Sequence, residues 1–379
     1  MQTALLQGTA KQRPPVHKSQ AHPGVHPLSP LSHATQRFQP LPAPIKDPPY
    51  HYDLTTAIPD IEKAAALIFH TVGDTGGIKN GSFQAAVAGA MKADLNLPAN
   101  QKPAFFYHLG DVVYYNGQTD DYYDQFYDPY DHYNAPIFSI PGNHDGDPID
   151  SSQTSLDGWV RYFMTQNPQV DPLSKDAPRV TMSQPYVYFT LECPFATVVG
   201  LYTNVPEHGS IDSQQQQWLT NELATAPDGK ALIVCLHHPI YSFDDHHSGS
   251  PNMADVLQNA INDSRRIPNI VLTAHVHNYQ HIEKKIGDST IPFIVAGNGG
   301  YYHMHNLNSP EGTTDASTGA KLIKANDKLH GYLTLKVDGR HVSGTSFLVD
   351  NGSGNTSQFE QFQYPAGALR LAQGATAAL

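Results

Sequence analysis

The segment PAFFYHLGDVVYY (residues 103–115) joins an apolar run of strand length to a Gly-Asp pair that follows it directly. An uninterrupted apolar run of this length is typical of a buried strand in an α/β protein. Ligands of such proteins collect beyond the carboxyl ends of the strands, and Gly110 would allow the tight turn that brings Asp111 to that edge. The segment therefore predicts a strand and a ligand-bearing turn. It leaves open why a tyrosine, Tyr114, stands three residues after the aspartate.

The same arrangement recurs in four other segments. They are HTVGDTGG (70–77), SIPGNHDG (139–146), VCLHHPIYS (234–242) and LTAHVHNYQ (272–280). Each places Asp, Asn or His just past an apolar run, and glycine again precedes the polar residue at Asp74 and Asn143. Singly, each segment is as well explained by a turn or a surface strand. Together and in this order, the five segments predict one site at the edge of a sheet.

Apolar runs of strand length alternate with amphipathic helical stretches from about residue 64 to residue 350. Continuous apolar strands with helices between them indicate buried sheets whose outer faces the helices cover. The later runs come in pairs, and Asp338-Gly339 in the segment KVDGRHV is typical of a hairpin turn. We therefore expect an α/β (α+β) fold whose last strands are antiparallel.

Composition divides the chain into three parts. Residues 1–60 are rich in proline, which disfavours helices and sheet ladders, so we expect an extended or disordered arm there. Residues 61–350 carry the alternating pattern and form the main domain. Residues 351–379 return to Gly, Ser, Gln and Ala, which predicts a loosely attached low-complexity tail. The acidic and aromatic segment 120–134 would either line a pocket or pack as a surface helix.

The 379-residue chain has a formal net charge of -12 and only two cysteines. Without a basic excess we expect no nucleic-acid partner, and without a long apolar stretch we expect no membrane span. The N-terminus has no apolar core of signal-peptide length. A cytoplasmic location is therefore the default expectation, and a secreted or periplasmic one is the alternative. The sequence predicts no particular oligomeric state.

The polar residues at the five strand ends supply oxygen and imidazole nitrogen but no thiolate. This set of donors suits zinc, iron or manganese. Two aspartates, an asparagine and at least three histidines exceed the needs of one ion, and they fit two ions bridged by a carboxylate. Metal pairs of this kind are characteristic of enzymes that hydrolyse phosphate esters.

The five blocks together resemble those of the purple acid phosphatases, a branch of the calcineurin-like metallophosphoesterase superfamily. The blocks are Asp74-Thr75-Gly76, Gly110-Asp111-x-x-Tyr114, Gly142-Asn143-His144-Asp145, Val234-x-x-His237 and Ala274-His275-Val276-His277. The resemblance implies a four-layer metallophosphoesterase sandwich, with two mixed β-sheets flanked by helices and residues 61–350 as the catalytic domain. One departure is Ala274, where the family has glycine. The other is the Pro-rich arm, which stands in place of the N-terminal β-sandwich of larger members.

The resemblance also implies which residues hold two metal ions. The ligands are Asp74, Tyr114 and His277 for the first ion, Asn143, His237 and His275 for the second, and Asp111 bridging both. The wider superfamily has histidine at the position of Gly76, which cannot bind a metal, and the Tyr114 phenolate takes its place. A phenolate favours Fe(III) at the first site, with Fe(II), zinc or manganese at the second.

The function implied by the resemblance is that of an acid phosphatase, a metal-dependent phosphoric ester hydrolase. A metal-bound hydroxide would attack the phosphorus of a small phosphate monoester, and His144 would protonate the leaving group. By the same resemblance, Asp111 would act in catalysis as the bridging ligand. The expected substrate contacts are Asn143, His246 and His247.

Two other functions stay open on the sequence alone. A phosphodiesterase acting on cyclic nucleotides or other diesters would share the metal site, because specificity resides in the surrounding loops. A non-catalytic metal- or phosphate-binding protein would have no need of His144 as a proton donor. Beside the expected ligands, His238 is expected to be structural, and Asp145 is expected to orient His144 or to close its turn.

Overall fold

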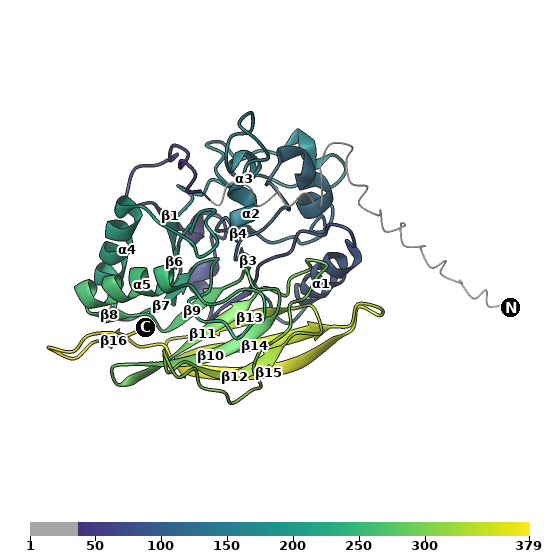
Figure 1. Cartoon of the computed structure of the whole chain (residues 1–379). Coiled ribbons are helices and arrows are strands. Elements are labelled where there is room, and N and C mark those ends of the chain that lie inside the picture. Colours follow the sequence, from purple (N-terminus) through teal and green to yellow (C-terminus); the bar gives the residue numbers. More distant parts are fainter. Residues whose placement is uncertain (1–36) are drawn as a thin grey trace, which may run out of the picture.

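Two β-sheets pack face to face and carry helices on their outer sides (Figure 1). The structure is a computed structural model of the chain, and it describes residues 37–379. The predicted sandwich of two mixed sheets flanked by helices is confirmed. Among residues 37–379, no helix is both long enough and apolar enough to cross a membrane.

The larger sheet has eight strands in the order β1-β5-β6-β7-β9-β11-β10-β12. They are β1 (His51–Asp53), β5 (Phe189–Glu192), β6 (Ala196–Gly200), β7 (Ala231–Cys235), β9 (Ile270–Thr273), β11 (Ser289–Ala296), β10 (Tyr279–Ile286) and β12 (Lys321–Asn326). The middle strands β6, β7, β9 and β11 run parallel, whereas β10 is antiparallel to both of its neighbours. The carboxyl ends of the parallel strands therefore meet at one edge of the sheet.

The second sheet has six strands in the order β15-β14-β13-β2-β3-β4. They are β15 (Thr356–Pro365), β14 (His341–Val349), β13 (Gly331–Val337), β2 (Leu67–Val72), β3 (Phe105–His108) and β4 (Ile137–Ser139). Strands β2, β3 and β4 are parallel, and β13, β14 and β15 add antiparallel strands beside β2. The predicted hairpin at Asp338-Gly339 lies between β13 and β14. A separate ribbon pairs β8 (Arg266–Ile267) with β16 (Leu369–Arg370).

The helices of the described chain are mostly short. The α-helices are α1 (Ser82–Asp94), α2 (Asn143–Gly146), α3 (Asp157–Phe163), α4 (Ser213–Thr225) and α5 (Pro251–Ser264). The 3₁₀ helices are η2 (Leu54–Thr56), η3 (Ile61–Lys63), η4 (Thr119–Asp121) and η6 (Pro172–Ser174). The one π-helix of residues 37–379 is η5 (Tyr123–Tyr127). Helix α1 contacts β13 and β14 of the six-stranded sheet, and α4 lies against α5 on the side of the eight-stranded sheet (Figure 1).

Capping side chains fix where α4 and α5 begin. The Asp212 carboxylate accepts a hydrogen bond from the backbone N–H of Gln215 at 2.8 Å. The Ser250 hydroxyl accepts one from the backbone N–H of Met253 at 3.0 Å. Each bond satisfies an amide that the first turn of a helix otherwise leaves without a partner.

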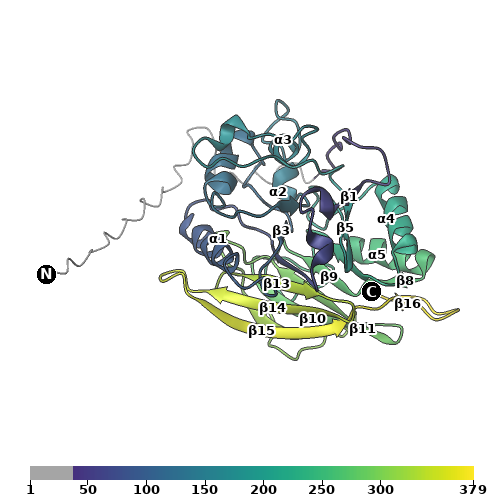
Figure 2. The same ribbon diagram turned by 180° about the vertical axis from the view of Figure 1, so that it is seen from behind.

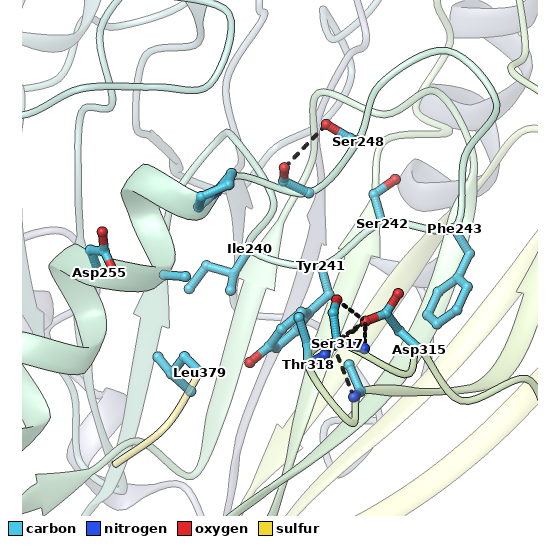
Figure 3. A pocket seen from close by; sticks show the side chains of 14 residues that line it. Ile240, Tyr241, Ser242, Phe243, Ser248, Asp255, Asp315, Ser317, Thr318 and Leu379 are labelled. Atoms are coloured by element: carbon cyan, nitrogen blue, oxygen red, sulfur yellow. Dashed lines mark hydrogen bonds between the residues drawn. The ribbon is translucent and has the colours of Figure 1, made fainter. Parts of the chain in front are cut away.

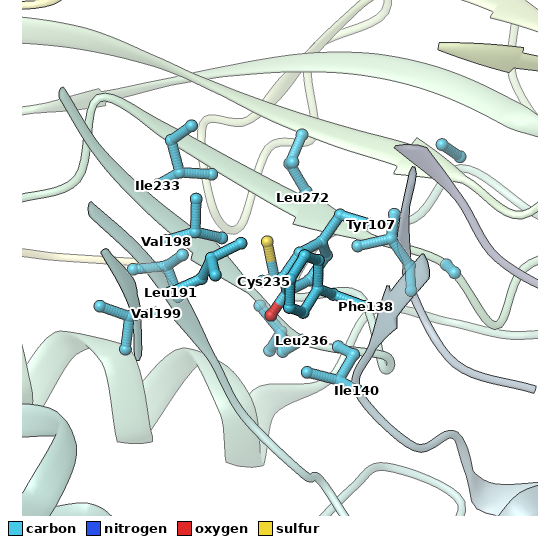
Figure 4. Packing of buried hydrophobic residues seen from close by; sticks show 14 of the residues in the cluster. Tyr107, Phe138, Ile140, Leu191, Val198, Val199, Ile233, Cys235, Leu236 and Leu272 are labelled. Atoms are coloured by element: carbon cyan, nitrogen blue, oxygen red, sulfur yellow. The ribbon is translucent and has the colours of Figure 1, made fainter. Parts of the chain in front are cut away.

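The core lies between the two sheets (Figure 4). Leu191 and Val198 of the eight-stranded sheet and Tyr107 and Phe138 of the six-stranded sheet are fully buried in one cluster. The sheets approach so closely that a Cβ atom on Gly200 would lie 2.2 Å from the Tyr107 hydroxyl. Burial of these large side chains between the sheets holds the two layers in a fixed relation.

Two stretches expected to be loosely organised are part of the fold. Tyr50 and Tyr52 are buried, and residues 51–53 form β1, which pairs with β5. Residues 356–365 form β15, which pairs with β14 along its whole length at the outer edge of the six-stranded sheet (Figure 2). The prediction of a loose tail was wrong there, because an edge strand needs backbone pairing but few apolar side chains. Residues 1–36 of the expected arm lie outside the described residues.

The segment 120–134 packs its aromatic side chains into the protein and leaves some of its polar residues exposed. Five of its aromatic side chains are buried, namely Tyr122, Phe126, Tyr127, Tyr130 and Tyr133. Phe126 contacts Tyr162 and Phe163 of α3, with ring centroids 4.7 and 5.6 Å away. The segment therefore forms a second aromatic cluster beside the carboxyl end of β3.

Candidate metal centre

The polar residues of the five segments converge from both sheets. Asp74 follows β2, Asp111 follows β3 and Asn143 follows β4, while His237 follows β7 and His275 follows β9. Parallel strands bring their carboxyl ends to one edge, so the two sheets together present these side chains at one place.

Three of these positions have a left-handed backbone. The φ angles are 55° at Asp74, 55° at Asp111 and 66° at His275, a conformation that non-glycine residues rarely adopt. Backbone strain of this kind clusters at functional sites, where the surrounding structure holds it. Glycine beside them allows close approach. A Cβ on Gly142 would lie 2.1 Å from Asp111 Oδ1, and one on Gly110 would lie 2.7 Å from His237 Nδ1.

Asp74, Tyr114 and His277 form the first group of polar atoms. The Tyr114 hydroxyl donates a hydrogen bond to Asp74 Oδ1 at 3.0 Å and lies 3.3 Å from His277 Nε2. His277 Nε2 is also 3.5 Å from Asp74 Oδ1. The other ring nitrogen of His277 donates to the His303 carbonyl at 3.1 Å, which leaves Nε2 to face the group.

Asp111, Asn143, His237 and His275 form the second group. Asn143 Oδ1 lies 3.0 Å from His237 Nε2 and 3.0 Å from His275 Nδ1. Asp111 Oδ2 lies 3.4 Å from His237 Nε2. His237 Nδ1 donates to the Leu109 carbonyl at 2.8 Å, which directs Nε2 toward the aspartate.

Two buried atoms of the second group have no hydrogen-bond partner within residues 37–379, namely Asp111 Oδ2 and His275 Nε2. A buried polar atom without a partner is costly, so each is open to an ion, a ligand or a water molecule. One ligand atom each from Asp111, His237 and His275 lies within 4.8 Å of the other two. Carboxylate, amide and imidazole donors therefore fit the metal pair that the sequence predicts.

Burial keeps two of the histidines neutral. It lowers the pKa of His275 to about 3 and the pKa of His277 well below its usual value. A neutral imidazole has the lone pair that a metal ion requires. His237 differs, because the Asp111 carboxylate overcomes the effect of burial and raises the pKa of His237 to about 9. Protonated His237 places a positive charge beside Asp111, which a bound cation would otherwise supply.

Tyr114 is fixed by a residue that the sequence did not single out. Gln125 accepts a hydrogen bond from the Tyr114 backbone N–H at 2.9 Å and donates one to the Tyr114 carbonyl at 2.7 Å. Burial raises the pKa of the Tyr114 hydroxyl well above its usual value, so a phenolate here requires a neighbouring cation. Gln125 belongs to the buried segment 120–134, which gives that segment a positional role in the site.

His144 and Asp145 lie beside the second group. The His144 backbone N–H donates to Asp111 Oδ1 at 2.9 Å, and its ring Nδ1 donates to the Tyr115 carbonyl at 2.8 Å. Asp145 accepts hydrogen bonds from the backbone N–H groups of Gly142, Val112 and Val113 at 2.8 to 3.1 Å. Asp145 therefore closes the turn, one of its two expected roles.

Three more histidines surround these groups. His238 is buried, and its Nδ1 is hydrogen-bonded to the Thr203 hydroxyl at 2.7 Å, a structural position. His247 contacts His275, with ring centroids 4.4 Å apart, and donates from Nδ1 to Glu207 at 2.6 Å. His246 is exposed and contacts His247 edge-on, with ring centroids 4.5 Å apart. The structure thus places His246 and His247, two of the three expected substrate contacts, beside the proposed metal ligands.

A sixth strand end contributes residues that sequence reasoning missed. Strand β11 is followed by GNGGYYHMH (297–305), which repeats the pattern of an apolar run, glycine and histidine. Tyr301 lies 4.4 Å from the Tyr114 ring and 4.3 Å from the His277 ring between centroids. His305 lies 4.3 Å from His277 in the same measure. The apolar run followed by glycine and histidine could therefore have identified this strand end from the sequence.

A separate cavity of about 320 Å³ is lined by Phe243 and Ser248, which flank His246 and His247 in the sequence (Figure 3). Ile240, Tyr241 and Phe243 line it together with Leu379 at the end of the chain. No expected metal ligand lines this cavity. It is therefore distinct from the site formed by the strand ends.

Comparison with known proteins identifies the family. Residues 50–279 match the calcineurin-like phosphoesterase family, and since this is more than half of the 379 residues, the chain belongs to it. Members of this family act on phosphoesters and typically bind two metal ions. The chain is thus a metallophosphoesterase by family.

One curated relative matches part of the chain. The chain is 29% identical over 134 residues to the 3',5'-cyclic adenosine monophosphate phosphodiesterase CpdA of Escherichia coli K12. That match covers 35% of this chain and spans only 40% of the relative.

The solved structures resemble this chain in fold. A purple acid phosphatase from yellow lupin seeds has a TM-score of 0.57 at 16% identity, covering 80% of this chain and 54% of that one. GAP50, an inner-membrane-complex anchor of Plasmodium, has a TM-score of 0.56 at 14% identity, covering 81% and 90%. A dimetal phosphatase from Danio rerio has a TM-score of 0.50 at 11% identity, covering 79% and 99%. At these identities the likeness shows the fold alone.

Proposed function

We propose that this chain hydrolyses small phosphate monoesters at a pair of metal ions, in the manner of a purple acid phosphatase. The observation that carries the proposal is the position of Tyr114, whose hydroxyl lies 3.0 Å from Asp74 Oδ1 and 3.3 Å from His277 Nε2. A phenol among a carboxylate and an imidazole is the donor set proposed for a trivalent iron. Tyr114 is thus the feature that separates this branch from the wider family.

The remaining ligands are assigned in the same way. Asp111 is proposed to bridge the two ions, and Asn143, His237 and His275 are proposed to hold a second ion of Fe(II), zinc or manganese. When bound, such ions lower the pKa of water and neutralise charge on phosphoryl oxygens. The unpartnered Asp111 Oδ2 and His275 Nε2 support this assignment.

His144 is proposed to protonate the leaving oxygen. Its Nδ1 donates to the Tyr115 carbonyl at 2.8 Å, so Nε2 is the nitrogen that can hold or release the transferred proton. Its backbone N–H donates to Asp111 at 2.9 Å, which fixes the imidazole beside the proposed bridge. Asn143, His246 and His247 are proposed to bind the phosphoryl group of the substrate.

A phosphodiesterase is the second candidate. The identity of 29% over 134 residues to a cyclic nucleotide phosphodiesterase favours it, although that match spans 40% of the relative. The proposed ligand set serves both reactions, because both involve attack at phosphorus. The preference between them depends on the loops that carry His246, His247 and Tyr301.

A comparison of three substrates tests the proposal. The purified protein, with its metal content measured, is assayed with p-nitrophenyl phosphate, bis(p-nitrophenyl) phosphate and 3',5'-cyclic AMP. We expect kcat/KM for the monoester to exceed both diester values by about tenfold or more, a difference of ~1.4 kcal/mol in transition-state binding. Asp111→Asn should lose all three activities. A higher kcat/KM for cyclic AMP would overturn the monoester assignment in favour of the second candidate.

A further inference from the structure

Three histidines outside the proposed ligand set lie together at the rim of the site. One ring nitrogen from each of His246, His247 and His305 lies within 4.8 Å of the other two. The ring centroids are 4.5, 4.9 and 5.1 Å apart. His246 is exposed, His247 is half-buried and His305 is 5% exposed, so the outer histidine triad opens toward solvent on one side.

Backbone pairing brings the two loops of the triad together. The Asp245 N–H donates to the Asn306 carbonyl at 3.0 Å, and the Asn308 N–H donates to the Phe243 carbonyl at 2.9 Å. The Asn308 side chain adds a bond to the Asp244 carbonyl at 2.7 Å. These bonds fix the histidines on both loops, which is the preorganisation that an ion-binding site requires.

A buried carboxylate, Asp244, supports all three histidines. Its Oδ1 accepts hydrogen bonds from the backbone N–H groups of His246 at 2.9 Å and His247 at 2.7 Å, and it faces His305 Nδ1 at 3.6 Å. Its Oδ2 accepts one from the Asn278 side chain at 2.9 Å. One buried carboxylate therefore lies behind all three histidines.

A carboxylate also lies beside Nδ1 of His247 and Nδ1 of His305. His247 Nδ1 donates to Glu207 at 2.6 Å, so its Nε2 has the free lone pair. His305 Nδ1 is directed at Asp244 and has no hydrogen bond among the residues that the structure describes. A carboxylate behind the distal nitrogen is the usual partner of a metal-binding imidazole, since it fixes the tautomer and raises the basicity of the ring.

We propose that His246, His247 and His305 form a third cation site that binds Zn²⁺, separate from the metal pair. Three imidazoles with an open side are a ligand set that zinc takes in proteins, with solvent or substrate in the remaining position. Asp244 and Glu207 are its positioning residues. None of its three ligands is assigned to the metal pair, so zinc binding at this site can be measured without substrate, although His246 and His247 are also the proposed phosphoryl contacts.

The position of this site gives it a use in substrate recognition. His247 contacts His275 at 4.4 Å and His305 contacts His277 at 4.3 Å between ring centroids, so the triad adjoins both halves of the proposed metal pair. A cation there adds positive charge next to the reacting phosphoryl group. It would favour substrates that carry a second anionic group, and His246 and His247 would then act through the ion.

Zinc stoichiometry tests the proposal. The full-length protein is dialysed against zinc at a buffered free concentration, and bound zinc per chain is measured for the wild type, His246→Ala, His305→Ala and His132→Ala. The His132 side chain is 65% exposed and pairs with Asp131, which makes it a matched control for weak surface binding. Every variant also keeps four N-terminal histidines, His17, His22, His26 and His33. Any zinc that they bind therefore cancels in the comparison between variants. We expect His246→Ala and His305→Ala each to bind one zinc ion fewer than the wild type and His132→Ala to bind the same number.

The difference between variants separates this proposal from the proposed function. If the phosphatase assignment fails, the loss of one zinc in His246→Ala still stands, because it is read without any substrate. An unchanged zinc count in His246→Ala would overturn the third site even if activity is high. His246 is exposed, so this variant is expected to fold if the more buried His305→Ala does not. Asp244→Asn should keep the fold and weaken zinc binding at the site by about 10- to 100-fold.

Discussion

At the scale of single residues, Tyr114 and Gly76 depend on each other. A Cβ on Gly76 would lie 2.7 Å from Tyr114 Cδ2 and 2.5 Å from the Gln125 side-chain oxygen. The Tyr114 ring therefore fills the space in which a side chain at position 76 would lie. A larger residue at position 76 and a tyrosine at position 114 therefore exclude one another.

The role of Tyr114 has a spectroscopic test. If its phenolate binds Fe(III), the air-oxidised iron protein should be violet, with a broad charge-transfer band in the visible region. Tyr114→Phe should lack the band, because phenylalanine has no oxygen to donate. Tyr115→Phe, a neighbouring control, should keep it. A violet Tyr114→Phe protein or a colourless iron-loaded wild type would contradict the assignment.

His144 has a kinetic test that depends on the leaving group. A general acid typically contributes about 10²- to 10⁴-fold to rate when the leaving oxygen needs a proton. We expect His144→Ala to lose that factor with an alkyl phosphate, a poor leaving group, and to lose much less with p-nitrophenyl phosphate. Steady-state kcat for the two esters measures the difference. Equal losses for both esters would remove His144 from proton transfer.

The residues at strand ends could be found from the sequence, and their supports could not. Asp74, Asp111 and His275 each follow an apolar run, a local pattern that the chain displays directly. Gln125 and Asp244 act through contacts between segments that approach only in the folded protein. No spacing in the sequence marks such a contact, so their positioning roles emerge only from the structure.

At the scale of elements, the sequence predicted the buried strands and missed two edge strands, β1 and β15. Strands such as β7 are apolar throughout and buried on both faces, which gives a clear signal. Strand β15 reads TSQFEQFQYP, with mostly exposed polar side chains, and its pairing with β14 depends on backbone groups. Strand β1 is short and follows a proline-rich stretch, so its pairing with β5 had no local signal.

The attachment of β1 has a pH-dependent test. His51 Nε2 donates to Glu222 of α4 at 2.8 Å, and this bond raises the pKa of His51 above its usual value of 6.5, although burial opposes it. The folded state thus binds the His51 proton more tightly than the unfolded state does. The stability that protonated His51 contributes is therefore complete below pH 6.5, and it is lost as the pH rises through the pKa of His51 in the folded protein.

We therefore expect the wild type to exceed His51→Gln in unfolding free energy by more at pH 5.5 than at pH 8.5. Because the His51 side chain is 37% exposed, solvent screens the pair and the change should be below about 1 kcal/mol. Urea unfolding at the two pH values measures it. A pH-independent difference would show that the charge on His51 does not hold β1 in place.

At the scale of the whole molecule, the site depends on the packing of two sheets. Asp74 and Asp111 come from the six-stranded sheet, whereas His237 and His275 come from the eight-stranded one. The side chains between the layers therefore set the distances within the site as well as the stability of the fold.

A substitution in that layer should destabilise the protein. Leu191 is fully buried between the sheets, so Leu191→Ala should lower the unfolding free energy by about 2–5 kcal/mol through lost burial and the cavity it leaves. Leu97→Ala is the control, because Leu97 is 39% exposed and its loss should have little effect. Chemical denaturation compares the two. Equal stability of both variants would contradict the assignment of this layer as the core.

The most direct test of the metal-dependent mechanism is to remove the metal and restore it. The protein is stripped with a chelator, its metal content is measured, and p-nitrophenyl phosphate hydrolysis is followed as iron and zinc are added back, for the wild type and for Asp111→Asn. We expect the stripped wild type to be inactive and its activity to rise until two ions are bound at the proposed metal pair. Asp111→Asn should stay inactive with either metal. Full turnover by the metal-free protein, or by Asp111→Asn, would contradict the metal-dependent mechanism.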